Sequence, residues 1–191
     1  GTLKGVEVAF QTFFDFLPRP WDGLAVQLNY THVTQSGISN SNLAVQPGYT
    51  PGGTIAFGGG LQVNDAIIDS HRLAGISDDS YNIVALYERG PVGVRLAYSW
   101  RSEFLTNNLD CCIGLPMWQK AGGYLDGSIR FQVGNHVELS LDGSNLLDRT
   151  IVSQQQLFGD SALTPGAEPV RRDSAWIRSD RRFQLGFRFK Y

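Results

Sequence analysis

Apolar and polar residues alternate along much of the chain. The pattern is clearest in residues 181–191, where Phe183, Leu185, Phe187 and Phe189 occupy every second position and polar residues or glycine lie between them. Successive side chains of a strand point to opposite faces, so a period of two predicts strands with one apolar and one polar face. Further stretches of the same kind are residues 24–30, 92–100, 125–133 and 137–143.

Two weaker stretches complete the set. Val6, Val8 and Phe10 alternate with more polar residues, and residues 81–87 form an apolar row whose opposite face is partly apolar as well. Together the stretches predict an all-β chain of antiparallel, up-and-down strands. The seven predicted strands lie near residues 5–17, 21–36, 77–89, 91–104, 121–133, 137–148 and 177–191.

The connections between these strands fall into two classes that alternate strictly. Three are short, at residues 18–22, 89–91 and 134–136, and three are long, at 37–76, 105–120 and 149–176. Tight turns at one end and long loops at the other are typical of transmembrane β-barrels of the bacterial outer membrane. In such a barrel the long loops face the outside and the turns face the periplasm.

The apolar row can face lipid or a protein core. Lipid is favoured because aromatic residues lie near the ends of the rows, as in the interfacial girdles of barrels. The strands are also longer than the five to six residues or so that are usual in globular sheets. The alternative is a soluble, secreted β-sandwich that binds carbohydrate through loop aromatics. It predicts that Phe183, Leu185, Phe187 and Phe189 are buried.

Seven strands do not close a bacterial barrel, which has an even number of strands and at least about eight. The chain also starts without a recognisable signal peptide. Both observations predict that residues 1–191 are part of a larger barrel whose other strands precede Gly1. A small eight-stranded outer-membrane protein is the alternative, with an eighth strand inside residues 37–76.

An ordered series of segments resembles the C-terminal third of the barrel of TonB-dependent receptors, the active transporters of the Gram-negative outer membrane. The series covers nearly the whole chain, and each segment alone is a weak motif. Its members are GVEVAFQTFFDFLP (5–18), WDGLAVQLNYTHV (21–33), SYNIVALYERGPVGVRLAYSWRSEFL (80–105), GYLDGSIRFQV (123–133), LSLDGSNLLDRT (139–150) and RRFQLGFRFKY (181–191).

The resemblance implies that residues 1–191 are one partial domain of a 22-stranded barrel that encloses an N-terminal plug. Its partners would be outer-membrane lipid and lipopolysaccharide, the TonB protein through the absent N-terminal part, and the barrel-assembly machinery through the terminal Tyr191. The implied activity is uptake of a scarce, large solute. A ferric siderophore is the commonest cargo of the family, and cobalamin and oligosaccharides are the alternatives.

Composition removes several other classes of function. Sixteen Lys and Arg against eighteen Asp and Glu give a net charge of −2, which argues against a globally basic nucleic-acid binder. No apolar run is long enough for a transmembrane helix.

We expect neither an enzyme, nor a metal site, nor a bound cofactor. No nucleophile elbow is present, and the Gly-rich segment 57–61 lacks the residues of a phosphate-binding loop, so it is expected to be a flexible loop. The Asn145–Asp148 turn is expected to bind nearby backbone groups. The histidines are scattered and the two cysteines are adjacent, at His32, His71, His136, Cys111 and Cys112.

Candidate ligand-binding residues follow from the alternation and from the long loops. Arg95, Arg101, Asp126 and Arg130 belong to the polar rows and would face the lumen of a barrel. Trp118 and Trp176 lie in long loops, where their rings could stack on a sugar or a catecholate. A group of basic residues near the last strand is either an anion site or a solvated surface, with the solvated surface favoured. Its members are Arg171, Arg172, Arg178, Arg181 and Arg182.

Overall fold

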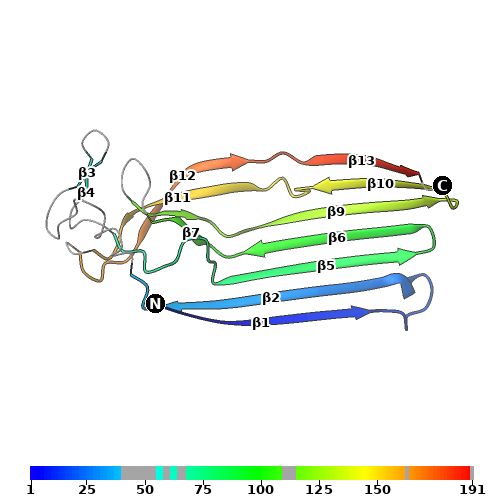
Figure 1. The fold of residues 1–191 in the computed structure, drawn as a ribbon, viewed down its shortest axis with the longest axis horizontal. Coiled ribbons are helices and arrows are strands. Elements are labelled where there is room, and N and C mark those ends of the chain that lie inside the picture. The colour runs from blue at the N-terminus through cyan, green and yellow to red at the C-terminus, as the bar shows by residue number, and fades with distance from the viewer. Residues whose placement is uncertain (40–54, 58–60, 64–67, 109–114, 162–163, 190–191) are drawn as a thin grey trace.

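The computed structural model describes residues 1–39, 55–57, 61–63, 68–108, 115–161 and 164–189. Within these residues the protein is all-β, and seven strands form one antiparallel sheet in the order β1-β2-β5-β6-β9-β10-β13 (Figure 1). The sequence-based prediction of a seven-stranded meander is confirmed. The strands are β1 (Thr2–Phe13), β2 (Leu24–Ser36), β5 (Asp79–Arg89), β6 (Val92–Arg101), β9 (Gly122–Val133), β10 (Val137–Ser144) and β13 (Arg182–Phe189).

Short and long connections alternate as predicted, with the short ones at one end of the sheet (Figure 1). Gly90 and Gly134 have φ angles of +56° and +60° in the β5–β6 and β9–β10 turns, a conformation that glycine adopts without strain. The β1–β2 connection contains the 3₁₀ helix η1 (Trp21–Gly23). β1 ends at Phe13, whereas the sequence predicted a strand that extends to Leu17. The last pair between β1 and β2 is Phe13 with Ala25.

The prediction that residues 105–120 and 149–176 are plain loops is wrong. They contain most of a second antiparallel sheet, in the order β12-β11-β8-β7, which lies beyond the loop end of the first sheet (Figure 1). A short hairpin within residues 37–76 pairs only with itself in the parts that the structure describes, and it adds no eighth strand to the main sheet. These strands are β7 (Phe104–Asn107), β8 (Met117–Gln119), β11 (Thr150–Phe158), β12 (Val170–Arg178), β3 (Ile55–Phe57) and β4 (Leu61–Val63).

A left-handed residue separates β10 from β11. Asn145 has a φ angle of +52°, so β10 ends at Ser144 instead of continuing to Asp148. Its side-chain oxygen accepts a hydrogen bond from the backbone N–H of Arg149 at 2.8 Å, and its amide donates to the carbonyl oxygen of Ser179. The expected backbone-binding role of this turn is confirmed. The strand that follows starts at Thr150 and enters the second sheet.

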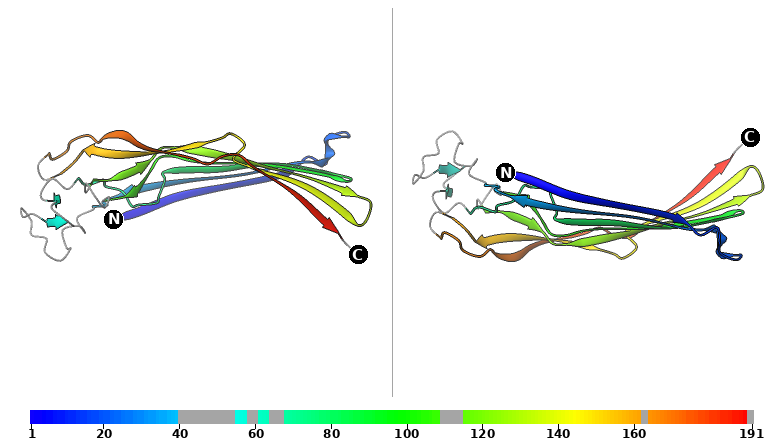
Figure 2. Two further views of the ribbon diagram at one scale, coloured as in Figure 1. Left: turned by 90° about the horizontal axis from the view of Figure 1, so that it is seen from above. Right: turned by 90° about the horizontal axis from the view of Figure 1, so that it is seen from below.

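The seven-stranded sheet is a single twisted layer. Views along it show no described element stacked on either face of the seven strands (Figure 2). Its apolar row is accordingly exposed, with Leu185 at 81%, Phe187 at 69% and Phe183 at 65% exposure. No helix among the described residues is long and apolar enough to cross a membrane. Tyr191, Cys111 and Cys112, singled out in the sequence, lie outside the described residues.

Buried apolar side chains gather instead around the second sheet. Leu105 is fully buried, Phe104 and Trp118 are almost so, and Ile68 joins them from the connection that precedes β5. Only Ala25 among the buried apolar residues of the described chain lies in the seven-stranded sheet. The second sheet therefore has the packing of a small globular unit, whereas the first sheet does not.

Candidate ligand-binding face

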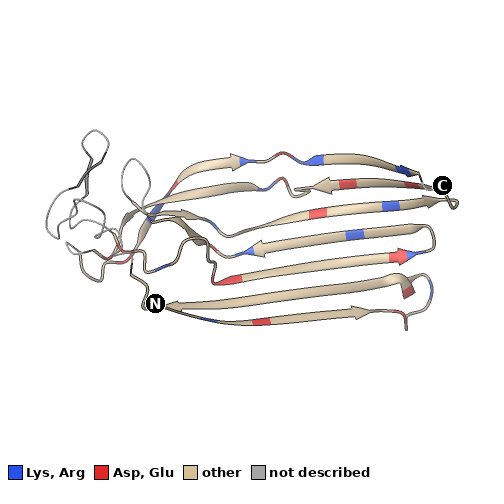
Figure 3. Cartoon of the chain, in the orientation of Figure 1, with Lys and Arg blue, Asp and Glu red and all other residues tan. Residues whose placement is uncertain are grey.

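Strand register places the predicted lumen residues on one face. Arg95 of β6 lies opposite Ser128 of β9, while the neighbouring positions pair Ala97 with Asp126 and Gly93 with Arg130. Residues that lie directly opposite in a sheet share a face. The structure thus brings Arg95, Asp126 and Arg130 together, as the alternation predicts. Figure 3 shows charges of both signs along these strands.

The three residues line an open groove of about 990 Å³ on this polar face. Asp142 of β10 and Arg182 of β13 continue it, so acidic and basic groups alternate across the strands. Asp126 is also a structural group, because its carboxylate accepts a hydrogen bond from the backbone N–H of Asn145 at 2.9 Å. The groove presents a mixed-charge, water-exposed surface that suits a polar solute.

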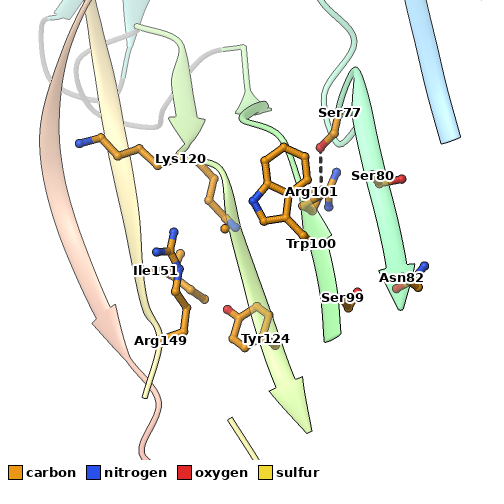
Figure 4. A pocket seen from close by; sticks show the side chains of 12 residues that line it. Ser77, Ser80, Asn82, Ser99, Trp100, Arg101, Lys120, Tyr124, Arg149 and Ile151 are labelled. Atoms are coloured by element: carbon orange, nitrogen blue, oxygen red, sulfur yellow. Dashed lines mark hydrogen bonds between the residues drawn. The ribbon is translucent and has the colours of Figure 1, made fainter. Parts of the chain in front are cut away.

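Arg101, the fourth predicted residue of this row, lies apart from the groove, in a second pocket of about 240 Å³ at the loop end of the sheet. Its Nε donates to the Ser77 hydroxyl at 2.8 Å, and a terminal nitrogen donates to the Gly75 carbonyl at 2.7 Å. The guanidinium also lies 3.6 Å from the centre of the Phe104 ring. These contacts fix Arg101 at the junction of the two sheets (Figure 4).

Arg149 is the functional candidate that the sequence did not reveal. It follows the turn at Asn145 and lines the same pocket as Arg101 and Tyr124. Its guanidinium lies directly over Gly122, where an added Cβ would be 2.6 Å from the guanidinium carbon. Tyr124 lies on β9, Arg149 lies just before β11, and both side chains line the pocket (Figure 4). Nothing in the alternation of apolar and polar residues predicts the position of Arg149.

The two candidate tryptophans have opposite environments. Trp118 is buried, and its indole N–H donates to the side-chain oxygen of Gln156 at 2.7 Å. The Arg171 guanidinium covers the ring at 3.6 Å from its centre. Trp118 is thus part of the packing of the second sheet rather than an open stacking platform. Trp176 on β12 is 64% exposed and remains accessible to a ligand.

Two of the five basic residues near the last strand, Arg171 and Arg178, form ion pairs. Arg178 lies 2.6 Å from Asp148, and this hydrogen bond holds the pKa of the Asp148 carboxyl below its usual value. Arg171 pairs with Glu103 at 2.5 Å. At these two residues the contacts favour an ion-paired surface over an anion site.

A histidine ion pair ties the β2–β5 connection to the end of β11. His71 Nε2 lies 2.8 Å from the Asp160 carboxylate. Partial burial alone lowers the pKa of His71, but its bond to Asp160 contributes to a net rise above 6.5. The Gly166 N–H and His71 hold the pKa of Asp160 below 3.8. The pair is therefore fully formed between these ordinary values, and is lost as pH rises through the raised pKa or falls through the lowered one.

We expect this attachment to loosen on the alkaline side. The Asp69 N–H donates to the Asp160 carbonyl at 2.8 Å, so its hydrogen-exchange protection reports on the attachment. Protection, corrected for the intrinsic exchange rate, should fall as the pH rises above 6.5 and through the raised pKa of His71, because the imidazole then loses its proton. A His71→Gln variant should lose this dependence. Equal pH profiles for the two proteins would contradict the prediction.

The described residues contain no group of three or more His, Cys, Asp or Glu side chains arranged to hold a metal ion. No protein-family model, curated protein or solved structure matches the chain.

Proposed function

We propose that the chain is a wall segment of an outer-membrane uptake receptor similar to the TonB-dependent receptors. One observation carries this proposal: the seven-stranded sheet is a single layer with an exposed apolar face and a polar, charged opposite face. In water such an apolar face is costly, since burial of apolar surface stabilises by about 25 cal/mol per Å². A lipid bilayer removes this cost on one side and leaves the other side wet.

The same observation disfavours the soluble sandwich. That alternative requires Phe183, Leu185 and Phe187 in a core, whereas all three are well over half exposed. Sandwich cores form between two sheets stacked about 10 Å apart. The second sheet lies beyond the end of the first rather than over its apolar face (Figures 1 and 2).

Aromatic residues on the apolar face support a membrane boundary near the loop end. Tyr30, Tyr81 and Trp100 are aligned across β2, β5 and β6 by the strand register. The rings of Tyr81 and Trp100 stack at 5.1 Å between centres, and Tyr98 lies 6.0 Å from Tyr81. Aromatic girdles of this kind mark the two interfaces of membrane barrels.

The remaining parts of the proposal follow the resemblance. β1 and β13 are the outer strands of the sheet, and open sheet edges are not tolerated in lipid. Further strands would pair with them to close a barrel of about 22 strands around a plug. TonB would energise uptake, and the barrel-assembly machinery would recognise the terminal Tyr191, which lies outside the described residues. The proposed cargo is a ferric siderophore, with cobalamin or an oligosaccharide as alternatives.

Fractionation of cells that express the full reading frame tests this proposal. We expect the protein in the outer membrane, extracted only by detergent, and migrating faster in gels before heating than after. Growth on a ferric siderophore, on cobalamin or on an oligosaccharide as the limiting nutrient should depend on the protein and on TonB for one cargo. A protein that remains in solution without detergent would contradict the membrane assignment.

A further inference from the structure

Two arginines line one pocket at the junction of the sheets. Arg101 of β6 lies directly opposite Gly122 of β9 in the strand register. The guanidinium of Arg149 occupies the space that a side chain at Gly122 would fill, with its nearest nitrogen overlapping the Cβ position. Glycine at this position therefore lets Arg149 approach the strand on the polar face, beside Arg101.

No acidic side chain in the lining of this pocket neutralises the charge of the two arginines. Neither Arg101 nor Arg149 has a carboxylate partner among the residues that the structure describes, and the lining contains no Asp or Glu. Arg149 donates to the carbonyl oxygen of Ala121, a neutral acceptor. Lys120 also lines the pocket, but its ammonium group pairs with Asp173 at 2.8 Å.

Three basic residues near the pocket differ from Arg101 and Arg149, whereas Arg172 resembles them in donating to a backbone carbonyl, that of Arg171. Arg171 and Arg178, like Lys120, each have an acidic partner within 4 Å. A guanidinium carries five N–H donors, and the bonds described above use two at Arg101 and one at Arg149. Both side chains thus retain donors for an incoming acceptor.

Hydroxyl groups complete the lining. The lining that contains the two arginines also contains the hydroxyl groups of Ser77, Ser80, Ser99 and Tyr124 (Figure 4). Hydroxyls and guanidinium groups both donate to anionic oxygens, and guanidinium groups are especially suited to planar carboxylate or phosphate edges. The pocket volume of about 240 Å³ accommodates one small group of this kind with a few waters, rather than a whole large solute.

We propose that the pocket between Arg101 and Arg149 binds an anionic oxygen group, a carboxylate or a phosphate, on the solute that the protein takes up. The assignment of the group to the solute rests on the proposed function. The pocket opens on the polar face, which would line the lumen, whereas lipopolysaccharide phosphates would lie beside the apolar face. Lipopolysaccharide is the other source of the same chemistry, and the experiment below separates the two.

The test measures anion binding by the full-length protein in detergent. Citrate and inorganic phosphate serve as anionic probes, and glucose serves as the neutral probe, each titrated by calorimetry. We expect saturable citrate binding that weakens with added salt, and no measurable glucose binding. Arg149→Gln and Arg101→Gln should each weaken citrate binding about tenfold or more, because each removes charge-assisted hydrogen bonds.

Two further variants give the measurement its specificity. Arg178→Gln removes an arginine that is already paired with Asp148, so citrate affinity should stay within about twofold of the parent protein. Gly122→Ala inserts a methyl group under the Arg149 guanidinium and should weaken citrate binding without removing a charge. This last result separates a positioned site from a general effect of net charge.

The outcomes are distinct from those of the fractionation experiment. Unchanged citrate affinity in Arg101→Gln and Arg149→Gln, in a protein that resides in the outer membrane, overturns the pocket assignment alone. Equal weakening by Arg178→Gln overturns it as well, in favour of diffuse charge. Citrate binding by a protein that is soluble would uphold the pocket and overturn the membrane role. Displacement of citrate by lipopolysaccharide micelles would overturn the solute as the source of the anion.

Discussion

Replacing Trp118 by alanine is expected to destabilise the second sheet by about 3–5 kcal/mol, the usual cost of removing a large buried aromatic side chain. Trp118 is 5% exposed, and its indole N–H is bonded to Gln156, which is itself 1% exposed. The substitution leaves a cavity and removes the partner of a buried amide oxygen, and both effects lower the free energy of unfolding. The loss should be local, because the seven-stranded sheet contributes no side chain to that bond.

Hydrogen exchange on the full-length protein measures this effect strand by strand. Amides of β8 and β11 should lose protection in Trp118→Ala, whereas amides at the centre of β6 and β9 should keep it. Trp176→Ala is the matched control, since Trp176 lies in the same sheet but is 64% exposed and should cost less than about 1 kcal/mol. Similar losses in the two variants would show that Trp118 is not the packing centre described above.

The second large effect is expected at Leu96, in the middle of β6 on the apolar face. Leu96→Arg should reduce the free energy of unfolding by about 2–4 kcal/mol when the protein is folded in a bilayer, the cost of a cation near its midplane. Leu96 is 45% exposed, lies opposite Gly127 of β9, and belongs to the apolar face that also contains Ile129 and Leu141. If that row faced water instead, an added arginine would be nearly neutral.

The adjacent position provides a control in the same strand. Ala97 lies on the polar face, opposite Asp126 of β9, so Ala97→Arg places the same charge beside a carboxylate and should change stability by less than about 0.5 kcal/mol. Urea titrations of the refolded protein in phospholipid vesicles compare the two variants. Equal effects at positions 96 and 97 would contradict a lipid-facing apolar row.

The sequence predicted the main sheet because its signal is local. In β6, β9 and β13 one face carries an apolar residue or a glycine at every second position, and this spacing depends on no other part of the chain. The second sheet gave no such signal. Its strands β7 and β8 have four and three residues, and β11 carries the run Gln154–Gln156, two of which are buried through tertiary contacts. Polar side chains of this kind do not indicate burial in the sequence.

The candidate site was predictable to the same extent. The alternation of side chains along each strand predicted that Arg95, Asp126 and Arg130 share one face. The pairing register of β6 and β9 confirms this. Arg149 was not predictable, since its position depends on the left-handed turn at Asn145 and on the absence of a side chain at Gly122. Trp118 was assigned to an open loop because nothing local reveals that a second sheet forms around it.

The strict alternation of short turns and long connections affects how the binding specificity of such a protein can change in evolution. Every strand of the main sheet pairs with the strand that precedes it in that sheet. Residues inserted in the long connections therefore leave the pairing register of the seven strands unchanged. Closing a loop twice as long costs only about 0.6 kcal/mol, a fraction of what a single core substitution costs. Recognition segments can therefore be lengthened, replaced or recombined while the wall keeps its assembly, and new specificities arise at small thermodynamic expense.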